Sequence, residues 1–210
     1  MDPKLKLKDV KIEEELKGTN VFVAIDGSFA GYFEISDTLI VRPSWEKAET
    51  KPGQAVLTID PGMSFGTGQH HTTKLCLERL EEIVRENDRV LDLGAGSGIL
   101  SIGALLLGAQ SAVGIDIDEN SVRIAKENPA QNKIESRFDA MCGNIIDDAD
   151  LRKKIGTDYD VVVANIVADV IILMSPLFRS FMHKNSTLIV SGIINRQKEE
   201  VKQALIKNGF

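Results

Sequence analysis

From residue 89 onward, short apolar runs alternate with longer stretches in which apolar residues recur every three or four positions. The short runs are typical of strands buried on both faces of a sheet, and the longer stretches are typical of amphipathic helices. We expect strands at residues 89–94, 111–117, 137–142, 159–165 and 187–192. We expect helices at residues 71–86, 98–107, 119–128, 169–183 and 195–208, the third of which Pro129 interrupts. This alternation predicts an α/β fold with a doubly wound, mostly parallel sheet.

The first 58 residues show a different pattern. Their apolar segments are separated by Gly and Asp turns and lie at residues 20–27, 31–36 and 38–45. We interpret residues 1–58 as a short antiparallel β lead-in. Residues 59–210 then form the main domain, because a chain of 210 residues suffices for one sizeable core.

Composition narrows the class of protein. With 25 basic and 31 acidic side chains, the net charge of -6 argues against capture of nucleic acid and favours a cationic substrate. Cys76 and Cys142 lie outside any metal-ligand spacing, so neither a disulfide framework nor a metal site is expected. The longest apolar run, residues 161–174, is too short and too polar to span a bilayer, and no signal peptide is visible. We therefore expect a cytoplasmic protein without membrane contact, and a monomer.

The stretch VLDLGAGSG, residues 90–98, leads from a buried strand through a Gly-x-Gly-x-Gly turn into an apolar helix. Glycines at such a turn permit positive φ and close approach of a ligand, and the helix N-terminus offers unpaired amide groups. We interpret Gly94 and Gly96 as cofactor-binding residues. In the alternative interpretation, the glycines only pack the helix against the strand.

Asp116 ends the next predicted strand, 22 positions after Gly94. An acidic residue at about that separation can accept hydrogen bonds from both hydroxyl groups of a ribose. The neighbouring Asp118 is expected to act instead as N-cap of the helix that starts at Glu119. The turn and Asp116 together predict a site for an adenosine-containing cofactor.

Nicotinamide cofactors and S-adenosylmethionine both fit this half-site. The spacing Gly-x-Gly-x-Gly favours the methyl donor, since Gly-x-Gly-x-x-Gly is typical of dinucleotide sites. Asn165 adds support because it ends the fourth strand, where an open α/β sheet faces its ligand crevice. The alternative, in which Asn165 caps the following helix, stays open.

Four stretches resemble the PrmA-type ribosomal protein methyltransferases, and the likeness covers roughly residues 39–210. They are DPGMSFGTGQHHTT from Asp60, VLDLGAGSGILSIGALLLGA from Val90, VGIDIDENSV from Val113 and VVVANIVA from Val161. The first is the specific one, because few other methyltransferases carry Asp-Pro-Gly followed by Phe-Gly-Thr-Gly. The resemblance implies a Rossmann-like class I methyltransferase fold. It also implies S-adenosylmethionine as cofactor and, as substrate, amino groups of ribosomal protein L11, on lysine side chains and/or the N-terminus.

Position by position, the resemblance implies which residues contact the cofactor: Thr73, Gly94, Asp116 and Asn165. It implies a loop over the methionine end formed by Phe65, Gly66, Thr67 and Gly68. His70 matches the family's histidine in Gly-Thr-Gly-x-His, which makes it a candidate catalytic residue. A capping role for His70 at the helix that begins near Thr72 is an equal alternative. The family's N-terminal substrate-gripping module and the closing hairpin of its sheet have no full counterpart here, so we expect a catalytic-domain form.

The residues after Asn165 predict the kind of acceptor. Ile166, Val167 and Ala168 offer no surface for stacking a planar acceptor, which favours an aliphatic amine. In-line methyl transfer depends mainly on alignment, so Asn165 is a candidate to orient that amine, with His70 or water as base. Alternative functions are a small-molecule amine methyltransferase, a non-catalytic nucleotide-binding module and, more remotely, a nicotinamide dehydrogenase.

Overall fold

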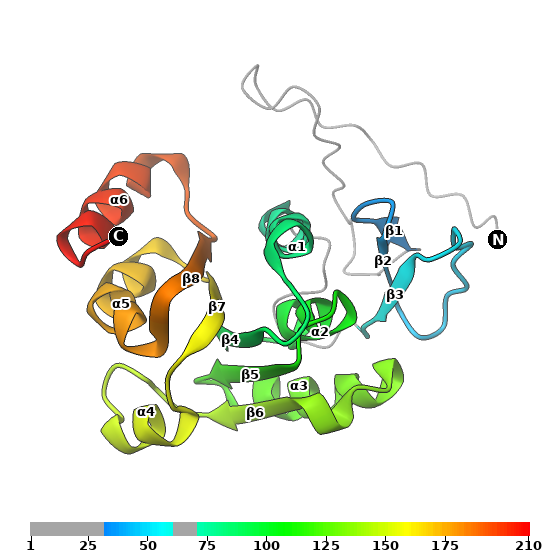
Figure 1. Ribbon diagram of the computed structural model, residues 1–210, viewed down its shortest axis with the longest axis horizontal. Helices are drawn as coiled ribbons and strands as arrows, with labels where there is room; N and C mark the ends of the chain where they lie inside the picture. The colour runs from blue at the N-terminus through cyan, green and yellow to red at the C-terminus, as the bar shows by residue number, and fades with distance from the viewer. Residues whose placement is uncertain (1–31, 61–70) are drawn as a thin grey trace.

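The computed structural model describes residues 32–60 and 71–210, and its centre is a five-stranded parallel sheet (Figure 1). The strands are β4 (Arg89–Leu93), β5 (Ser111–Asp116), β6 (Phe138–Cys142), β7 (Tyr159–Asn165) and β8 (Met182–Ser191). Their spatial order is β6-β5-β4-β7-β8, and every neighbouring pair is parallel. The predicted doubly wound α/β fold is confirmed. The last strand begins at Met182 instead of residue 187, directly after the preceding helix.

Helices cover both faces of this sheet. They are α1 (His71–Ile83), α2 (Ile99–Leu106), α3 (Glu119–Asn132), α4 (Ala149–Ile155), α5 (Ala168–Phe181) and α6 (Lys198–Lys207). The first three pack on one face and the last three on the other, each side with its own apolar core. Successive side chains of β7 enter opposite cores, because Val161 and Val163 face α1 whereas Val162 and Ala164 face α5. Within the described ranges, no helix is long and apolar enough to cross a membrane.

Pro129 does not end α3, and the prediction that it interrupts this helix is wrong. The helix continues to Asn132 and is capped by Lys133 in the left-handed conformation. Proline removes one intrahelical hydrogen bond. Tertiary contacts offset that loss, because the Asn132 side chain accepts from the Thr58 amide at 2.8 Å and donates to the Thr58 carbonyl at 2.7 Å.

Helix α4 was not predicted from the sequence. It has only seven residues, which is too short for a clear periodic pattern. Its start is nevertheless defined by Asp148, whose side chain accepts a hydrogen bond from the Leu151 amide at 2.8 Å.

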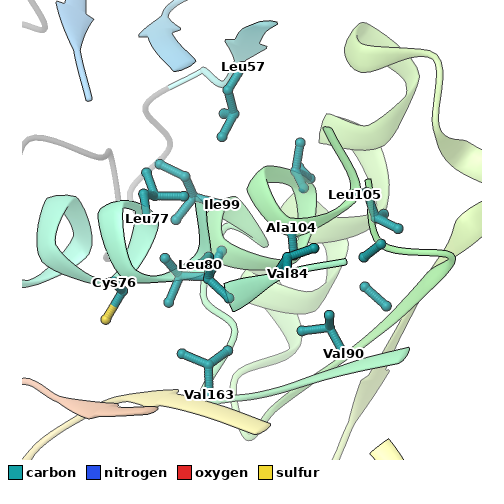
Figure 2. Close-up of a cluster of buried hydrophobic side chains, with 14 of the residues drawn as sticks. Leu57, Cys76, Leu77, Leu80, Val84, Val90, Ile99, Ala104, Leu105 and Val163 are labelled. Atoms are coloured by element: carbon teal, nitrogen blue, oxygen red, sulfur yellow. The ribbon is translucent and has the colours of Figure 1, made fainter. Parts of the chain in front are cut away.

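The lead-in contains a separate three-stranded sheet of β1 (Phe33–Glu34), β2 (Leu39–Arg42) and β3 (Ala55–Thr58). β1 and β2 are antiparallel as predicted, but β3 was not predicted and pairs with β2 in parallel. The predicted apolar segment 20–27 lies outside the described residues. Leu57 of β3 is buried in the same core as Leu77 of α1 and Ile99 of α2 (Figure 2). The small sheet therefore packs on the α1–α2 side of the fold.

Candidate active site

The candidate site lies where the sheet reverses its order. Strand β4 is the middle strand of the sheet. After β4 the chain adds β5 and β6 on one side, and it then crosses to the other side and adds β7 and β8. Loops that follow the carboxyl ends of such strands diverge and leave room for a ligand at this switch point. The glycine-rich turn follows β4, and Asn165 ends β7. The fold thus brings two sequence-predicted features to one edge of the sheet.

The glycine-rich turn is tight and left-handed. Gly94, Gly96 and Gly98 have backbone φ angles of 77°, 55° and 80°, which residues with a Cβ atom rarely adopt. The amides of Gly94 and Ala95 both donate to the Ile115 carbonyl, at 2.8 and 3.0 Å. Gly98 is the N-cap of α2 and contributes no side chain there. Gly94 and Gly98 also let the turn pack closely against the side chains of Ile166 and Phe138, respectively.

Asp116 is half-buried beside this turn. One carboxylate oxygen accepts a hydrogen bond from the Gly96 amide at 2.8 Å, and the other accepts from the Asp118 amide at 3.0 Å. These bonds fix the carboxylate, and each oxygen keeps a further lone pair for a ligand hydroxyl group. Asp118 accepts from the amides of Asn120 and Ser121, so its predicted role as N-cap of α3 is confirmed. Hydrogen bonds from Ser121 and Asn120 lower the pKa of Asp118.

Asn165 and Thr73 meet across the site. The Asn165 side-chain amide donates to the Thr73 hydroxyl at 3.3 Å, and Thr73 on α1 is buried. The two residues are 92 positions apart in the chain. Val167, not Asn165, is the N-cap of α5. The alternative interpretation of Asn165 as a helix cap is therefore wrong.

The loop that the resemblance assigns to the methionine end lies outside the described residues, and so does the candidate catalytic histidine. These positions are Phe65, Gly66, Thr67, Gly68 and His70. Asp60, the first residue of that motif, is described. Its carboxylate accepts from the Ser44 amide at 2.7 Å, the Ser44 hydroxyl at 3.0 Å and the Gln131 side chain at 3.0 Å. Asp60 thereby anchors the chain to the ends of β2 and α3 just before the loop.

Asp92 of β4 is a site feature that we did not predict. The Ser101 amide and hydroxyl donate to Oδ2 at 3.2 and 2.9 Å, whereas the buried Oδ1 has no hydrogen-bond partner among the described residues. Burial raises the pKa of Asp92 to about 7, the Ser101 hydrogen bonds oppose this shift, and the charge of Asp116 adds to it. A carboxylate inside the apolar run VLDLG was the signal in the sequence.

The cysteines occupy opposite environments, and both are free thiols. Cys76 extends from α1 in the first core (Figure 2), and burial raises its pKa to about 11. A hydrogen bond with Ser191 opposes this increase, and the charge of Asp92 adds to it. Cys142 is exposed and pairs with Asp116 in the sheet. The described ranges contain no group of three or more His, Cys, Asp or Glu side chains that could hold a metal ion.

Comparison with known proteins places this geometry in a family. The family model described as "Ribosomal protein L11 methyltransferase (PrmA)" matches residues 28–210. The chain belongs to the PrmA family. The PrmA chain is 44% identical over 194 residues to a ribosomal protein L11 methyltransferase of Lachnoclostridium phytofermentans, covering 85% of the chain and 58% of that relative. It is 46% identical over 186 residues to the protein of the same name from Agathobacter rectalis, covering 85% and 57%.

Solved structures agree with this assignment to PrmA. The ribosomal protein L11 methylase of Lactobacillus delbrueckii subsp. bulgaricus has a TM-score of 0.76 and 31% identity, with 86% of this chain and 88% of that chain covered. A putative methyltransferase crystallised with SAH, SMU.776, has a TM-score of 0.57 at 13% identity over 66% of this chain and 40% of that one, which supports the fold alone. The PrmA chain spans somewhat more than half the length of the two curated relatives above.

Proposed function

We propose that the protein is an S-adenosylmethionine-dependent N-methyltransferase that acts on amino groups of ribosomal protein L11, on lysine side chains and/or the N-terminus. The observation that carries the proposal is the convergence of the Gly94 turn, Asp116 and the Asn165–Thr73 pair at the switch point of a PrmA-family sheet. The relatives' names give L11 as their substrate. We further propose that the protein works as a cytoplasmic monomer without contacting nucleic acid, and that residues 1–58 are a lead-in to a domain at 59–210.

The described residues fit this cofactor. Gly94 and Gly96 offer backbone without side chains, and the Asp116 carboxylate can accept from the ribose hydroxyl groups. When bound, S-adenosylmethionine supplies an electrophilic methyl group on a positively charged sulfur. Thr73 and the loop at residues 65–68 are proposed to contact its methionine end.

Asn165 is proposed to orient the acceptor amine. Because its side-chain amide donates to Thr73, its carbonyl oxygen is the atom that can accept a hydrogen bond from that amine. A lysine amine must first lose a proton, which costs roughly 4.6 kcal/mol at pH 7 for an unperturbed lysine pKa of about 10.4. A nearby sulfonium and a partly dry pocket lower the pKa of the amine. His70 or water is proposed to accept the proton.

Isothermal titration with S-adenosylmethionine and its demethylated product tests the cofactor site. Asp116→Ala should weaken binding by about 1–3 kcal/mol, because charge-assisted hydrogen bonds are lost. Asp118→Ala is the matched control, since Asp118 caps α3 and should affect binding much less. Equal affinities for Asp116→Ala and wild type would show that another acid binds the ribose.

Transfer of a labelled methyl group to purified L11 tests the substrate. We expect label on amino groups of L11, located by peptide mass spectrometry. Label on small amines but not on L11 would favour the small-molecule alternative. Cofactor binding without transfer to any acceptor would favour the non-catalytic alternative.

A further inference from the structure

Ile166 lies at the centre of the switch point, among the ends of three strands. Gly94 follows β4, Ile166 follows β7 and Gly192 follows β8, and β7 lies between the other two strands in the sheet. The Ile166 amide donates to the Ser191 carbonyl at 3.2 Å. Its side chain is only partly exposed and packs against the core shared by α4, α5 and α6. Ile166 is therefore held in place both by a backbone hydrogen bond and by the packing of its side chain.

Both neighbouring glycines leave room for Ile166. A Cβ atom on Gly94 would lie 2.3 Å from Cγ2 of Ile166, and one on Gly192 would lie 2.4 Å from the Ile166 carbonyl oxygen. Real Cβ atoms essentially never approach other atoms below 3.0 Å. Gly94 and Gly192 also have φ of 77° and 83°, in the left-handed region. Ile166 thus fills the space that side chains at both positions would need.

We propose that Ile166 is a positioning residue for methyl transfer. Its branch at Cβ rests against Gly94, and this contact fixes the adjacent Asn165 relative to the cofactor turn. The inference rests on the proposed function, in which Gly94 contacts the cofactor and Asn165 orients the amine. A β-branched side chain suits the role because its χ1 angle is restricted. Alignment of the reacting atoms is sensitive, since a misplacement of about 1 Å can cost roughly 100-fold in rate.

Ile166→Val and Ile166→Leu form a matched pair of variants. Valine keeps a methyl group at the Cγ2 position and is one carbon shorter, whereas leucine keeps the number of carbons and moves the branch away from Cβ. For methylation of L11, we expect kcat of Ile166→Val within about twofold of wild type, and a drop of roughly tenfold or more for Ile166→Leu. The Kd of S-adenosylmethionine and the Tm should change little in either variant. A merely structural role would instead lower kcat and Tm together in both variants.

The side-chain amide of Asn165 gives a second readout that needs no turnover. Its signals in a proton–nitrogen NMR spectrum should stay in place in Ile166→Val and shift in Ile166→Leu. Wild-type kcat or unshifted Asn165 signals in Ile166→Leu would overturn the proposal. If the wild-type chain fails to bind the cofactor or to methylate L11, the proposed function fails instead. The NMR comparison would then still decide whether Ile166 positions Asn165.

Discussion

Replacing Asp92 with Asn should change how stability depends on pH. Burial raises the pKa of Asp92 to about 7 in the folded protein, whereas an unfolded Asp titrates near about 3.9. Because the folded protein holds the Asp92 proton more tightly than the unfolded chain, the contribution of Asp92 to stability is complete below the unfolded pKa. It is lost as the pH rises to the folded pKa. The step from pH 5 to pH 7 is about 2 pH units at about 1.36 kcal/mol each, so it lowers the free energy of unfolding by roughly 3 kcal/mol.

The Asn variant lacks this titration. Its side-chain carbonyl can still accept from Ser101, but its amide group takes the place of the unpartnered Oδ1, which costs about 1–3 kcal/mol. That cost is the same at every pH. The free energy of unfolding of Asp92→Asn relative to wild type should therefore increase by roughly 3 kcal/mol between pH 5 and pH 8.

Urea denaturation of both proteins, followed by circular dichroism from pH 5 to pH 8, measures this difference. Asp118→Asn serves as a control that should show no pH-dependent difference from wild type in this range, because hydrogen bonds lower the pKa of Asp118 and its titration lies below pH 5. Its contribution to stability is present above the unfolded pKa and is lost as pH falls through the folded pKa. Parallel stability curves for Asp92→Asn and wild type would refute the reasoning about Asp92.

Three further predictions use other parts of the site and fold. Iodoacetamide at pH 8 should alkylate the exposed Cys142 and leave Cys76 unmodified, as read by peptide mass spectrometry; modification of Cys76 in the folded protein would contradict the packing of α1. S-adenosylmethionine should slow alkylation of Cys142, which pairs with Asp116, and equal rates with and without it would place the ligand elsewhere. Asn132→Ala should lower the free energy of unfolding by about 1–3 kcal/mol, because β3 loses two hydrogen bonds. The free energy of unfolding is measured by urea denaturation. A decrease for Asn132→Ala no larger than the decrease for Gln131→Ala would contradict this prediction.

The sequence predicted the central sheet because strands β4 to β7 are apolar runs separated by helices. It also predicted Asp116 beside the glycine turn, since spacing along one βαβ unit is enough to bring the two together. The N-cap role of Asp118 followed from local chemistry alone. Local features were therefore accessible without a structure.

Features that depend on contacts distant in sequence were not accessible. Residues Asn165 and Thr73 are 92 positions apart, and no spacing rule predicts their hydrogen bond. The parallel pairing of β3 with β2 depends on a crossover whose path the local pattern does not define. The continuation of α3 through Pro129 depends on tertiary hydrogen bonds that outweigh local propensity. The environment of Asp92 likewise requires knowledge of which helix covers β4.

The outer surface of α5 and α6 could be engineered without altering the candidate site. Alternation along the strands sends Asp92, Asn165 and Ser191 toward α1 and α2, so these polar side chains of the candidate site lie on that side. The opposite side is held by apolar contacts with α4, α5 and α6. Exposed apolar side chains there, Leu173 at 62% and Ile206 at 52%, are open to polar replacement for higher solubility without disturbing the ligand edge.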